Sequence, residues 1–222
     1  MTHPHADHLA GLVEVLSRYN VDEVLYPALA SSDTGEYDKP LFDEWLRLIA
    51  EKSINSTLAE SNQELSVGGV VLDVLNPPAV PLKGTQSDVD NNSLVIRVRI
   101  GDISFLVTGD VMSEGEQEMA YERLLQQSTV LKVAHHGSDT SSTDEFLNTV
   151  MPQIAVISVG VNDYGLPTAE VLDRFTGRLG AANIYRTDTS GTIEFVTDGK
   201  KLWIKTGCPR LIPSPSPGGQ II

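Results

Sequence analysis

The chain has 222 residues, 41% of them hydrophobic and 21% charged, a composition that predicts a globular protein with an ordinary apolar core. Its net charge of −14 argues against broad binding to nucleic-acid phosphates, which needs a basic face, but it allows a local cationic pocket made by metal ions. The sequence shows no apolar run of transmembrane length, no secretory signal pattern and a single cysteine, Cys208, so we expect no internal disulfide and, by default, a cytoplasmic location.

The spacing of apolar residues in the first part of the chain predicts helices separated by strands. Helical spacing occurs at 9–19 and in the amphipathic segment 39–53, and DEVLYP (22–27) is typical of a short strand. A further strand at 68–78 ends at a proline pair. The polar loop after it, KGTQSDVDNN (83–92), is expected to be mobile.

The second part begins with the clearest β-hairpin, in which a two-residue Gly-Asp turn joins SLVIRVRI (93–100) to ISFLVTGD (103–110). A helix is then expected at about 113–127, with Ser113 as its N-cap and Glu116 completing a capping box. The remaining predicted elements are a buried strand leading into a loop (128–138), a short helix (143–150), a buried strand (153–160), a helix (168–178), a strand (183–187) and a hairpin (192–206) turning at Asp198-Gly199.

This alternation predicts a sheet-rich α/β (α+β) protein, in which helices fall between the strands. We expect one domain over residues 1–205. The segment 206–222 is rich in proline, serine and glycine and is predicted to be a disordered tail or the start of a linker.

All five histidines fall in two clusters, one in THPHADH (2–8) and the other at His135 and His136. Any one of them taken singly is better explained as an ordinary surface histidine, but the clustering indicates a metal site. In the first cluster, His3 and His5 can converge on one ion, while Asp7 and His8 point toward a second. Imidazole suits zinc, iron and manganese, and carboxylate adds affinity for manganese or magnesium.

Asp110 is the candidate for a carboxylate that bridges two such ions. It stands at the end of a buried apolar strand, directly after a glycine. Two ions about 3.5–4 Å apart form the clamp used for in-line hydrolysis of phosphoesters. The alternative is that Asp110 only caps the following helix.

Taken together, HPHADH, LVTGD, LKVAHHGSDTSS and AVISVGVNDYG resemble the metallo-β-lactamase fold hydrolases, and most specifically the soluble C-terminal domain of ComEC-type DNA-uptake (competence) proteins. The resemblance covers about 1–205. It implies a four-layer αββα sandwich with two divalent metal ions, zinc or manganese, at one edge of the two sheets. It also implies hydrolysis of phosphodiesters such as DNA, a membrane channel partner or a missing upstream domain, and an extracytoplasmic face if the chain serves DNA uptake.

The same resemblance assigns roles to individual residues. It implies the metal ligands His3, His5, Asp7, His8, Asp110 and His135. It implies catalytic roles for Asp7 and His136, and substrate contacts for His136, Ser138 and Ser142. The pattern leaves open which of the two adjacent histidines is the ligand. Lys132, in the same strand, is expected to be an ordinary lysine at the solvent edge.

Two departures from the family pattern affect this prediction. The family carries Tyr-Gly-His-Pro where this chain reads YGLP (164–167), and Leu166 can neither ligate a metal nor move a proton. The family also has strands before the metal motif, so we expect an N-terminally truncated domain with residues 1–20 loosely docked. The alternatives are therefore a small-molecule hydrolase acting on a lactone, thioester or cyclic phosphodiester, or an inactive remnant.

Overall fold

The structure is a computed structural model that describes residues 1–29 and 33–207, so the predicted tail from Cys208 onward lies outside the described residues. The helices are α1 (Ala6–Arg18), α2 (Lys39–Glu51), α3 (Asp88–Asn91), α4 (Ser113–Tyr121), α5 (Asp144–Val150), α6 (Ala169–Leu179) and α7 (Thr187–Ser190), with 3-10 turns η1 (Ala134–Gly137) and η2 (Ala181–Asn183). The strands are β1 (Glu23–Pro27), β2 (Asn55–Ala59), β3 (Glu64–Val67), β4 (Val70–Asn76), β5 (Val95–Ile100), β6 (Ile103–Val107), β7 (Val130–Lys132), β8 (Ile154–Ile157), β9 (Ile184–Arg186), β10 (Ile193–Thr197) and β11 (Leu202–Thr206).

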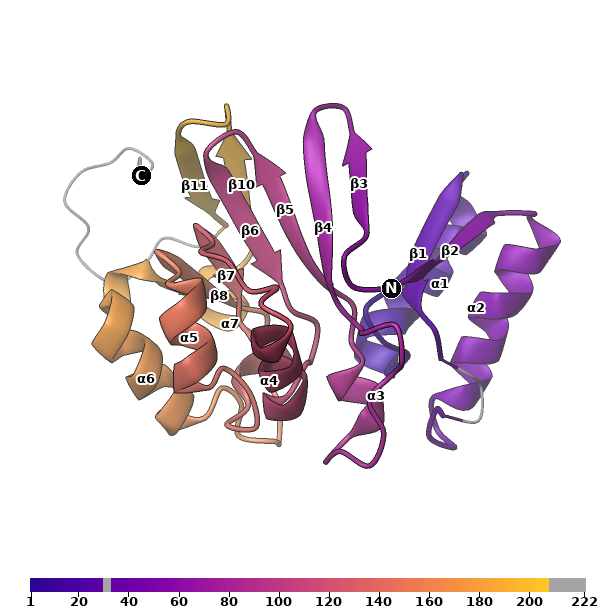
Figure 1. Ribbon diagram of the computed structural model, residues 1–222, viewed down its shortest axis with the longest axis horizontal. Helices are drawn as coiled ribbons and strands as arrows, with labels where there is room; N and C mark the ends of the chain where they lie inside the picture. The colour runs from indigo at the N-terminus through magenta and orange to yellow at the C-terminus, as the bar shows by residue number, and fades with distance from the viewer. Residues whose placement is uncertain (30–32, 208–222) are drawn as a thin grey trace.

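Seven strands form one mixed sheet in the order β3-β4-β5-β6-β7-β8-β9 (Figure 1). Neighbouring strands are antiparallel from β3 to β6 and parallel from β6 to β9. The predicted hairpin of β5 and β6 is confirmed, with Ile100 opposite Ile103. Its turn requires Gly101, which has φ 57°, because a Cβ at this position would lie 2.4 Å from the carbonyl oxygen of Gly199.

Helices α4, α5 and α6 cover one face of this sheet (Figure 1). Their apolar sides meet the central strands in one core, in which Phe146, Phe175 and Leu131 are fully or almost fully buried. Burying each side chain of this size contributes roughly 1.5–3 kcal/mol, so this contact is a main source of stability for the half of the molecule that carries β6 to β9.

The other face of the sheet is covered by two small sheets. The antiparallel pair β10-β11 packs on β6 to β9, where Leu202 and Ile204 are buried and the rings of Phe105 and Phe195 lie 5.7 Å apart. The parallel pair β1-β2 packs on β3 to β5 through a cluster that includes Leu25 and Ala59.

Helices α1 and α2 form the outermost layer, on the far side of β1 and β2 (Figure 1). In α1, Leu9, Leu12, Val13 and Leu16 recur at helical spacing, and this apolar stripe packs against Phe42 and Trp45 of α2. The sequence of layers is thus helices, sheet, sheet and helices. The predicted four-layer αββα sandwich is confirmed.

Strands β2 and β3 were not predicted, because their polar residues hide the strand pattern. In β3 (ELSV), no residue is buried, and in β2 (NSTLA) only Ala59 is. Both lie at a sheet edge or in a two-stranded sheet, so one face of each can remain in water. These two segments are strands because their backbones pair with a neighbouring strand, and not because their side chains are buried.

The predicted capping box of α4 is wrong. The helix begins at Ser113, but its N-cap is Met112, which offers no side-chain hydrogen bond. The carboxylate of Glu116 turns away from the helix start and accepts hydrogen bonds from the amides of Ser142 (2.6 Å) and Thr143 (2.9 Å). The helix also ends at Tyr121, earlier than the predicted residue 127.

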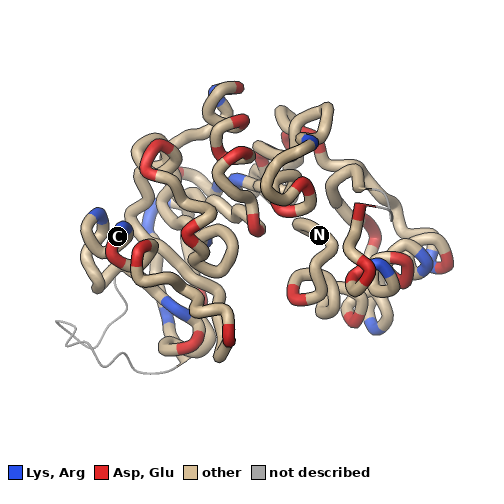
Figure 2. Tube along the Cα trace, turned by 90° about the horizontal axis from the view of Figure 1, so that it is seen from below, with Lys and Arg blue, Asp and Glu red and all other residues tan. Residues whose placement is uncertain are grey.

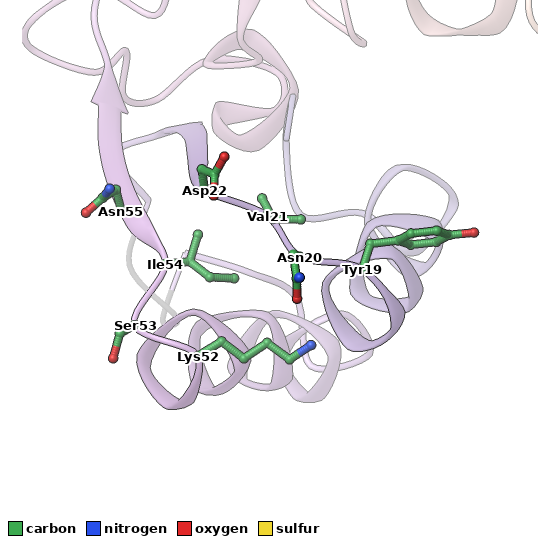
Figure 3. Close-up of a pocket in the computed structure, with 8 residues that line it drawn as sticks. All are labelled: Tyr19, Asn20, Val21, Asp22, Lys52, Ser53, Ile54 and Asn55. Carbon is green, nitrogen blue, oxygen red and sulfur yellow. The ribbon is translucent and has the colours of Figure 1, made fainter.

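A polar hollow of about 510 Å³ lies where α1 and α2 end, lined by residues 19–22 and 52–55 (Figure 3). The ammonium group of Lys52 donates hydrogen bonds to the carbonyl oxygens of Leu16 and Ser17, the latter at 3.0 Å. These are terminal carbonyls of α1, where a cation is favoured by the helix dipole. Lys52 therefore joins the two outer helices at one end.

The chain has 30 acidic and 16 basic residues, and the acidic ones are distributed along the whole described trace (Figure 2). Several of the basic residues are paired locally, such as Arg47 of α2, which contacts both Glu44 and Glu51. In the part of the chain that the structure describes, the helices are too short or too polar to cross a membrane.

Candidate metal centre

The segment that carries the first histidines is fixed to the rest of the fold by its backbone. The amino group of Met1 donates to the carbonyl oxygen of Leu25 (2.8 Å), and the amide of Leu94 donates to the carbonyl oxygen of Thr2 (2.8 Å). These bonds tie residues 1 and 2 to β1 and to the start of β5. The histidines that follow consequently lie at the end of the large sheet where β6 and β7 also finish.

A first group of side chains consists of His3, His5 and Asp90. The Nε2 atom of His3 lies 3.1 Å from Nδ1 of His5 and 3.6 Å from Oδ1 of Asp90, and the His5–Asp90 distance is 3.2 Å. His3 is fully buried, whereas the side chain of His5 is partly exposed. The predicted convergence of His3 and His5 is thus present, with a carboxylate beside them.

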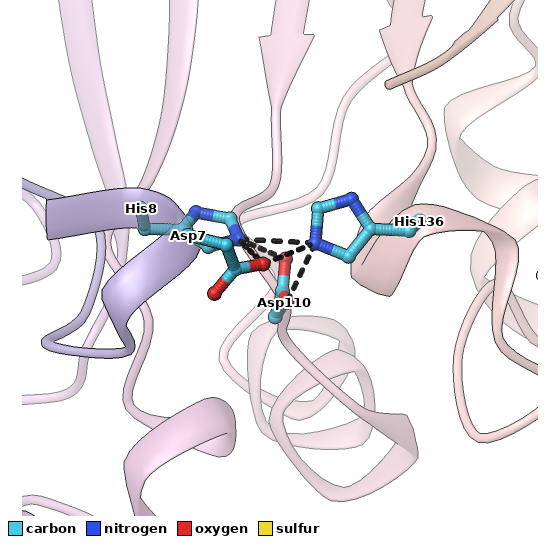
Figure 4. A group of neighbouring side chains, drawn as sticks. All are labelled: Asp7, His8, Asp110 and His136. Atoms are coloured by element: carbon cyan, nitrogen blue, oxygen red, sulfur yellow. Dashed lines mark hydrogen bonds and ion pairs between the residues drawn. The ribbon is translucent and has the colours of Figure 1, made fainter. Parts of the chain in front are cut away.

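A second group consists of Asp7, His8, Asp110 and His136 (Figure 4). The two imidazole Nε2 atoms lie 3.2 Å apart. The Nε2 atom of His136 lies 3.0 Å from Asp7 Oδ2 and 3.4 Å from Asp110 Oδ2, and that of His8 lies 3.2 Å from Asp110 Oδ1. Three segments far apart in the sequence therefore meet at one point.

Asp110 lies between the two groups. Besides its contacts in the second group, its Oδ2 atom is 3.9 Å from Nε2 of His3 in the first. The residue before it, Gly109, has φ 54°, and a Cβ there would lie 2.9 Å from the Cβ of Ser93. Glycine at this position allows the backbone to approach closely, and the carboxylate of Asp110 reaches the space between the imidazoles.

The chemistry of both groups fits a divalent cation. Tetrahedral ligands at about 2.0–2.1 Å from an ion lie about 3.3–3.4 Å from one another, close to the distances within each group. One buried carboxylate oxygen in each group, Oδ1 of Asp90 and Oδ1 of Asp110, accepts no well-aligned hydrogen bond, although an imidazole nitrogen lies 3.2 Å from each. A buried carboxylate oxygen without a well-aligned donor is costly, and a cation between it and the imidazole removes that cost.

Neighbouring groups orient the imidazoles with Nε2 toward the centre. His136 donates from Nδ1 to the carbonyl oxygen of Ser158 at 2.7 Å. The Nδ1 atom of His8 lies 3.1 Å from the hydroxyl of Thr2, and that of His3 lies 3.3 Å from the hydroxyl of Ser93. Contacts of this kind fix the ring orientation, and in His136 they fix the tautomer that leaves Nε2 free to bind a metal.

The ionisation of the second group matches a site built for positive charge. Burial acts to raise the pKa of Asp110, but the imidazoles of His136 and His8 outweigh it and hold this pKa below its ordinary value. The carboxylates of Asp110 and Asp7 raise the pKa of His136 to about 10. Burial lowers the pKa of His3 to about 3, so this imidazole is neutral. Without a metal, the proton on His136 offsets part of the negative charge of the two carboxylates.

The structure places the two adjacent histidines differently from the sequence interpretation. His136, assigned there to catalysis and substrate, belongs to the second group, whereas His135, assigned to the metals, belongs to neither. The Nδ1 atom of His135 lies 3.1 Å from the hydroxyl of Thr140. Both histidines have positive φ, 49° and 53°, so the backbone turns before His136 and the alternation of the preceding strand does not continue.

The two predicted substrate serines also differ from each other. Ser138 lines the cleft beside the centre, and its hydroxyl lies 2.9 Å from that of Thr140. Ser142 is fully buried and is not among the residues that line the cleft, and its amide donates to Glu116. Arg174 holds the same loop from the other side by donating to the carbonyl oxygens of Ser141 and Ser142.

Asp90 is the site residue that sequence reasoning missed. It was placed in a loop expected to be mobile, but that loop contains α3, whose N-cap Ser87 accepts a hydrogen bond from the amide of Asp90. The side chains of Asn91 and Asn92 are buried and bonded to backbone groups nearby. The dense run of Asp and Asn directly before the strand predicted at 93–100 was the available signal, since such side chains commonly bind nearby backbone groups and so order a turn.

Lys132 also departs from its prediction as a solvent-edge residue. Its ammonium group lies 3.4 Å from the carbonyl oxygen of Gly109 and 3.5 Å from that of Val133. Burial lowers its pKa. The Gly109 carbonyl also accepts from the amide of His135 at 3.3 Å, so this backbone contact joins the two loops that carry Asp110 and His136.

An open cleft of about 790 Å³ leads to the second group. Four of the residues that line it are aspartates, namely Asp7, Asp38, Asp110 and Asp139. The other lining residues are His5, Ala6, His135, His136, Ser138, Tyr164, Leu166 and Thr168, so among the described residues the lining contains no lysine or arginine. Leu166 therefore does border the site, at the position where the family pattern has histidine.

The fold and this constellation place the chain in the metallo-beta-lactamase superfamily, whose family model matches residues 1–161. The chain is 29% identical over 196 residues to ComE operon protein 3 of Bacillus subtilis (strain 168), covering 88% of this chain and 24% of that protein. It is 39% identical over 132 residues to competence protein ComA of Neisseria gonorrhoeae, covering 57% of this chain and 18% of that protein. The predicted resemblance to ComEC-type competence proteins is confirmed.

Solved structures agree on the fold. CmlA, a diiron beta-hydroxylase from Streptomyces venezuelae, aligns with a TM-score of 0.52 at 13% identity, over 84% of this chain and 42% of that one. The metallo-beta-lactamase fold protein YhfI from Bacillus subtilis aligns with a TM-score of 0.51 at 10% identity, over 84% of this chain and 72% of that one. The chain spans about a quarter or less of the length of the two competence proteins.

Metal binding is predicted to release a proton from His136. In the metal-free protein at pH 8 this imidazole is charged, because its pKa is about 10, whereas a ligating imidazole is neutral. We therefore expect release of about one proton from His136 when manganese binds, and an affinity that rises with pH up to about 10. Calorimetric titrations in two buffers of different ionisation enthalpy measure the number of protons.

The matched control is His135→Gln, which alters the neighbouring histidine outside both groups. This variant should retain the metal content and the proton release of the parent protein. His136→Gln should lose both. Full metal uptake by the parent protein without any proton release would contradict the assignment of His136.

Proposed function

We propose that the chain is a metal-dependent phosphodiesterase that acts on DNA. The observation that carries the proposal is the position of Asp110 between two groups of side chains that can ligate metals, each with a buried carboxylate oxygen that accepts no well-aligned hydrogen bond. Two adjacent divalent ions, manganese or zinc, would act as Lewis acids toward a phosphoryl oxygen. They would also lower the pKa of a bound water molecule, so that hydroxide is available near neutral pH. His3, His5 and Asp90 would hold one ion, and Asp7, His8 and His136 the other.

The remaining residues of the cleft can act on the substrate directly. The ring of His135 borders the cleft and is held through Nδ1 by Thr140, so its other nitrogen is available to bind a phosphate oxygen or to deliver a proton to a leaving oxygen. The hydroxyl of Ser138, held by the same threonine, can donate a hydrogen bond. Asp7 is more exposed than the other ligands and lies nearest to entering water and substrate.

The relatives support DNA as the substrate. One is a competence protein by name and another is a ComE operon protein, and the chain is also 29% identical over 175 residues to recombination protein 2 of Haemophilus influenzae, covering 78% of this chain and 19% of that protein. The relatives are far longer than the chain. A membrane channel partner, and a position at the outer face of the membrane, accordingly remain parts of the proposal.

A second candidate function is hydrolysis of a small molecule such as a lactone, a thioester or a cyclic phosphodiester. The acidic lining of the cleft favours it, because four aspartates without a lysine or arginine offer little attraction to the phosphates on either side of a scissile bond. Comparing single-stranded DNA, duplex DNA and a panel of these small esters, with manganese and with zinc, distinguishes the two functions.

Asp110→Ala is predicted to abolish hydrolysis and to lower the metal content. Without this carboxylate the two groups lose their shared member, so the ions are no longer held at working distance. We expect the parent protein to bind up to two ions and the variant fewer, as measured by elemental analysis after reconstitution. Asp139→Ala, which changes another aspartate of the cleft, serves as the control and should retain both ions.

Two outcomes would contradict this prediction. A metal content near zero in well-folded parent protein would exclude the dinuclear site. Parent-like rates in Asp110→Ala would show that this aspartate is not required to hold metal ions for hydrolysis.

Leu166→His is predicted to raise activity or metal affinity, because it restores the imidazole of the family pattern at the border of the cleft. The backbone can accept the change, since the amide and carbonyl of Leu166 are held by the side chain of Asn162 and not by the leucine side chain. Steady-state rates and metal titration of the variant measure both quantities. No gain in either, with an unchanged circular dichroism spectrum, would show that an imidazole at this position is not required.

A further inference from the structure

The loop between β8 and α6 brings Tyr164 to the edge of the cleft, and both ends of this loop are fastened to the segment that carries His136. At one end, the carbonyl oxygen of Ser158 accepts the hydrogen bond from His136 Nδ1. At the other, the amide of Thr168 donates to the carbonyl oxygen of Gly137 at 3.0 Å. The loop is consequently positioned by the same residues that build the candidate metal centre.

The side chain of Asn162 fixes the shape of this loop from within. Its amide nitrogen donates to the carbonyl oxygens of Gly160 and Leu166, both at 2.9 Å. Its oxygen accepts from the amides of Tyr164 (3.1 Å) and Leu166 (3.0 Å). The loop conformation is therefore set by hydrogen bonds of the backbone and of Asn162, without any contribution from the tyrosine ring.

Tyr164 itself contributes little to the folded core. Its side chain lines the cleft and is 86% exposed, and within the described residues its hydroxyl has no hydrogen-bond partner. A large aromatic ring held in water on a preformed loop gains nothing for stability. At the edge of a binding cleft it offers a flat apolar face that a ligand can cover.

The charges in the cleft restrict what that ligand can be. The lining contains four aspartates and, among the described residues, no lysine or arginine, so the cleft offers no cationic track for the backbone of a polynucleotide. Affinity beyond the reacting phosphate must come from uncharged contacts. Stacking of a base on an aromatic ring is such a contact and is worth about a 5- to 150-fold gain in affinity.

We propose that Tyr164 is a stacking surface for an unpaired base next to the scissile phosphodiester, and that the chain therefore selects single-stranded DNA over duplex DNA. This rests on the proposed function and names its substrate more closely. A base inside a duplex has both faces covered by its neighbours, so only an unpaired base can present its face to the ring. Half-buried Leu166, two residues further along the loop, adds an apolar contact beside the ring.

The test compares two single-stranded oligonucleotides of equal length, one with normal bases and one with abasic sites around the cleaved bond. With the manganese-loaded full chain, Tyr164→Ala should lower kcat/KM on the normal oligonucleotide by about 10-fold or more. The same variant should leave kcat/KM on the abasic oligonucleotide and the metal content unchanged. Tyr164→Phe should behave like the parent protein, since it keeps the ring.

Tyr121→Ala is the matched control, because this tyrosine is 80% exposed at the end of α4 and does not line the cleft. It should change neither rate. Equal losses on both oligonucleotides in Tyr164→Ala, or no loss on either, would overturn the proposal. A parent protein that cleaves duplex DNA as fast as single-stranded DNA would overturn it as well.

Fluorescence anisotropy of the same oligonucleotides separates this proposal from the proposed function. One outcome is that the parent protein cleaves neither oligonucleotide but binds the normal one at least 5-fold more tightly than the abasic one, and that Tyr164→Ala loses this difference. This outcome would support the stacking surface and contradict the hydrolytic function. Cleavage that does not depend on Tyr164 would contradict the stacking surface and leave the hydrolytic function supported. Absence of both cleavage and binding would contradict both proposals.

Discussion

The convergence of imidazoles and carboxylates around Asp110 is the interaction on which the arrangement of the site depends. Four histidines and three aspartates direct nitrogen or oxygen atoms into one small region, and the ligand atoms within each group lie within 4.8 Å of one another. Such an arrangement costs free energy unless positive charge lies among the carboxylates. In the metal-free protein the proton on His136 supplies part of that charge, and divalent cations would supply it fully.

The fold can support this arrangement because each ligand segment is bound to the ends of the sheet by its own backbone. Thr2 is joined to the start of β5, Asp110 follows β6, and His136 follows β7, which pairs with β6 in parallel. Further contacts then join these segments to one another, as in the carbonyl of Gly109, which binds both Lys132 and the amide of His135. The ligand positions are thus set by backbone geometry, and the side chains need only complete it.

The parts of this structure that could be predicted from the sequence are those in which the signal is local. The hairpin of β5 and β6 needs only alternation and a turn, and the His-x-His-x-Asp-His spacing places four ligand groups on one short segment. His136 could not be separated from His135, because two successive residues with positive φ break the strand periodicity used to assign faces. Asp90 could not be recognised, because its partners His3 and His5 are more than 80 residues away in the sequence. The burial of Ser142 likewise depends on a distant residue, because its amide donates to Glu116 of α4.

Charge links the candidate metal centre to the proposed substrate and reconciles an acidic composition with binding of a phosphodiester. A chain of net charge −14 with four aspartates in its cleft repels a phosphodiester in the absence of metal. In the proposed function, two divalent cations at the end of that cleft would reverse the sign of the local field where the reacting phosphate binds, while the rest of the surface would remain acidic. The electrostatic attraction would then act on one phosphate only, and the neighbouring acidic surface would add no affinity for the other phosphates of a long polynucleotide. The uncharged face of Tyr164 becomes important for this reason, since contacts with a base do not depend on the sign of the surrounding charge.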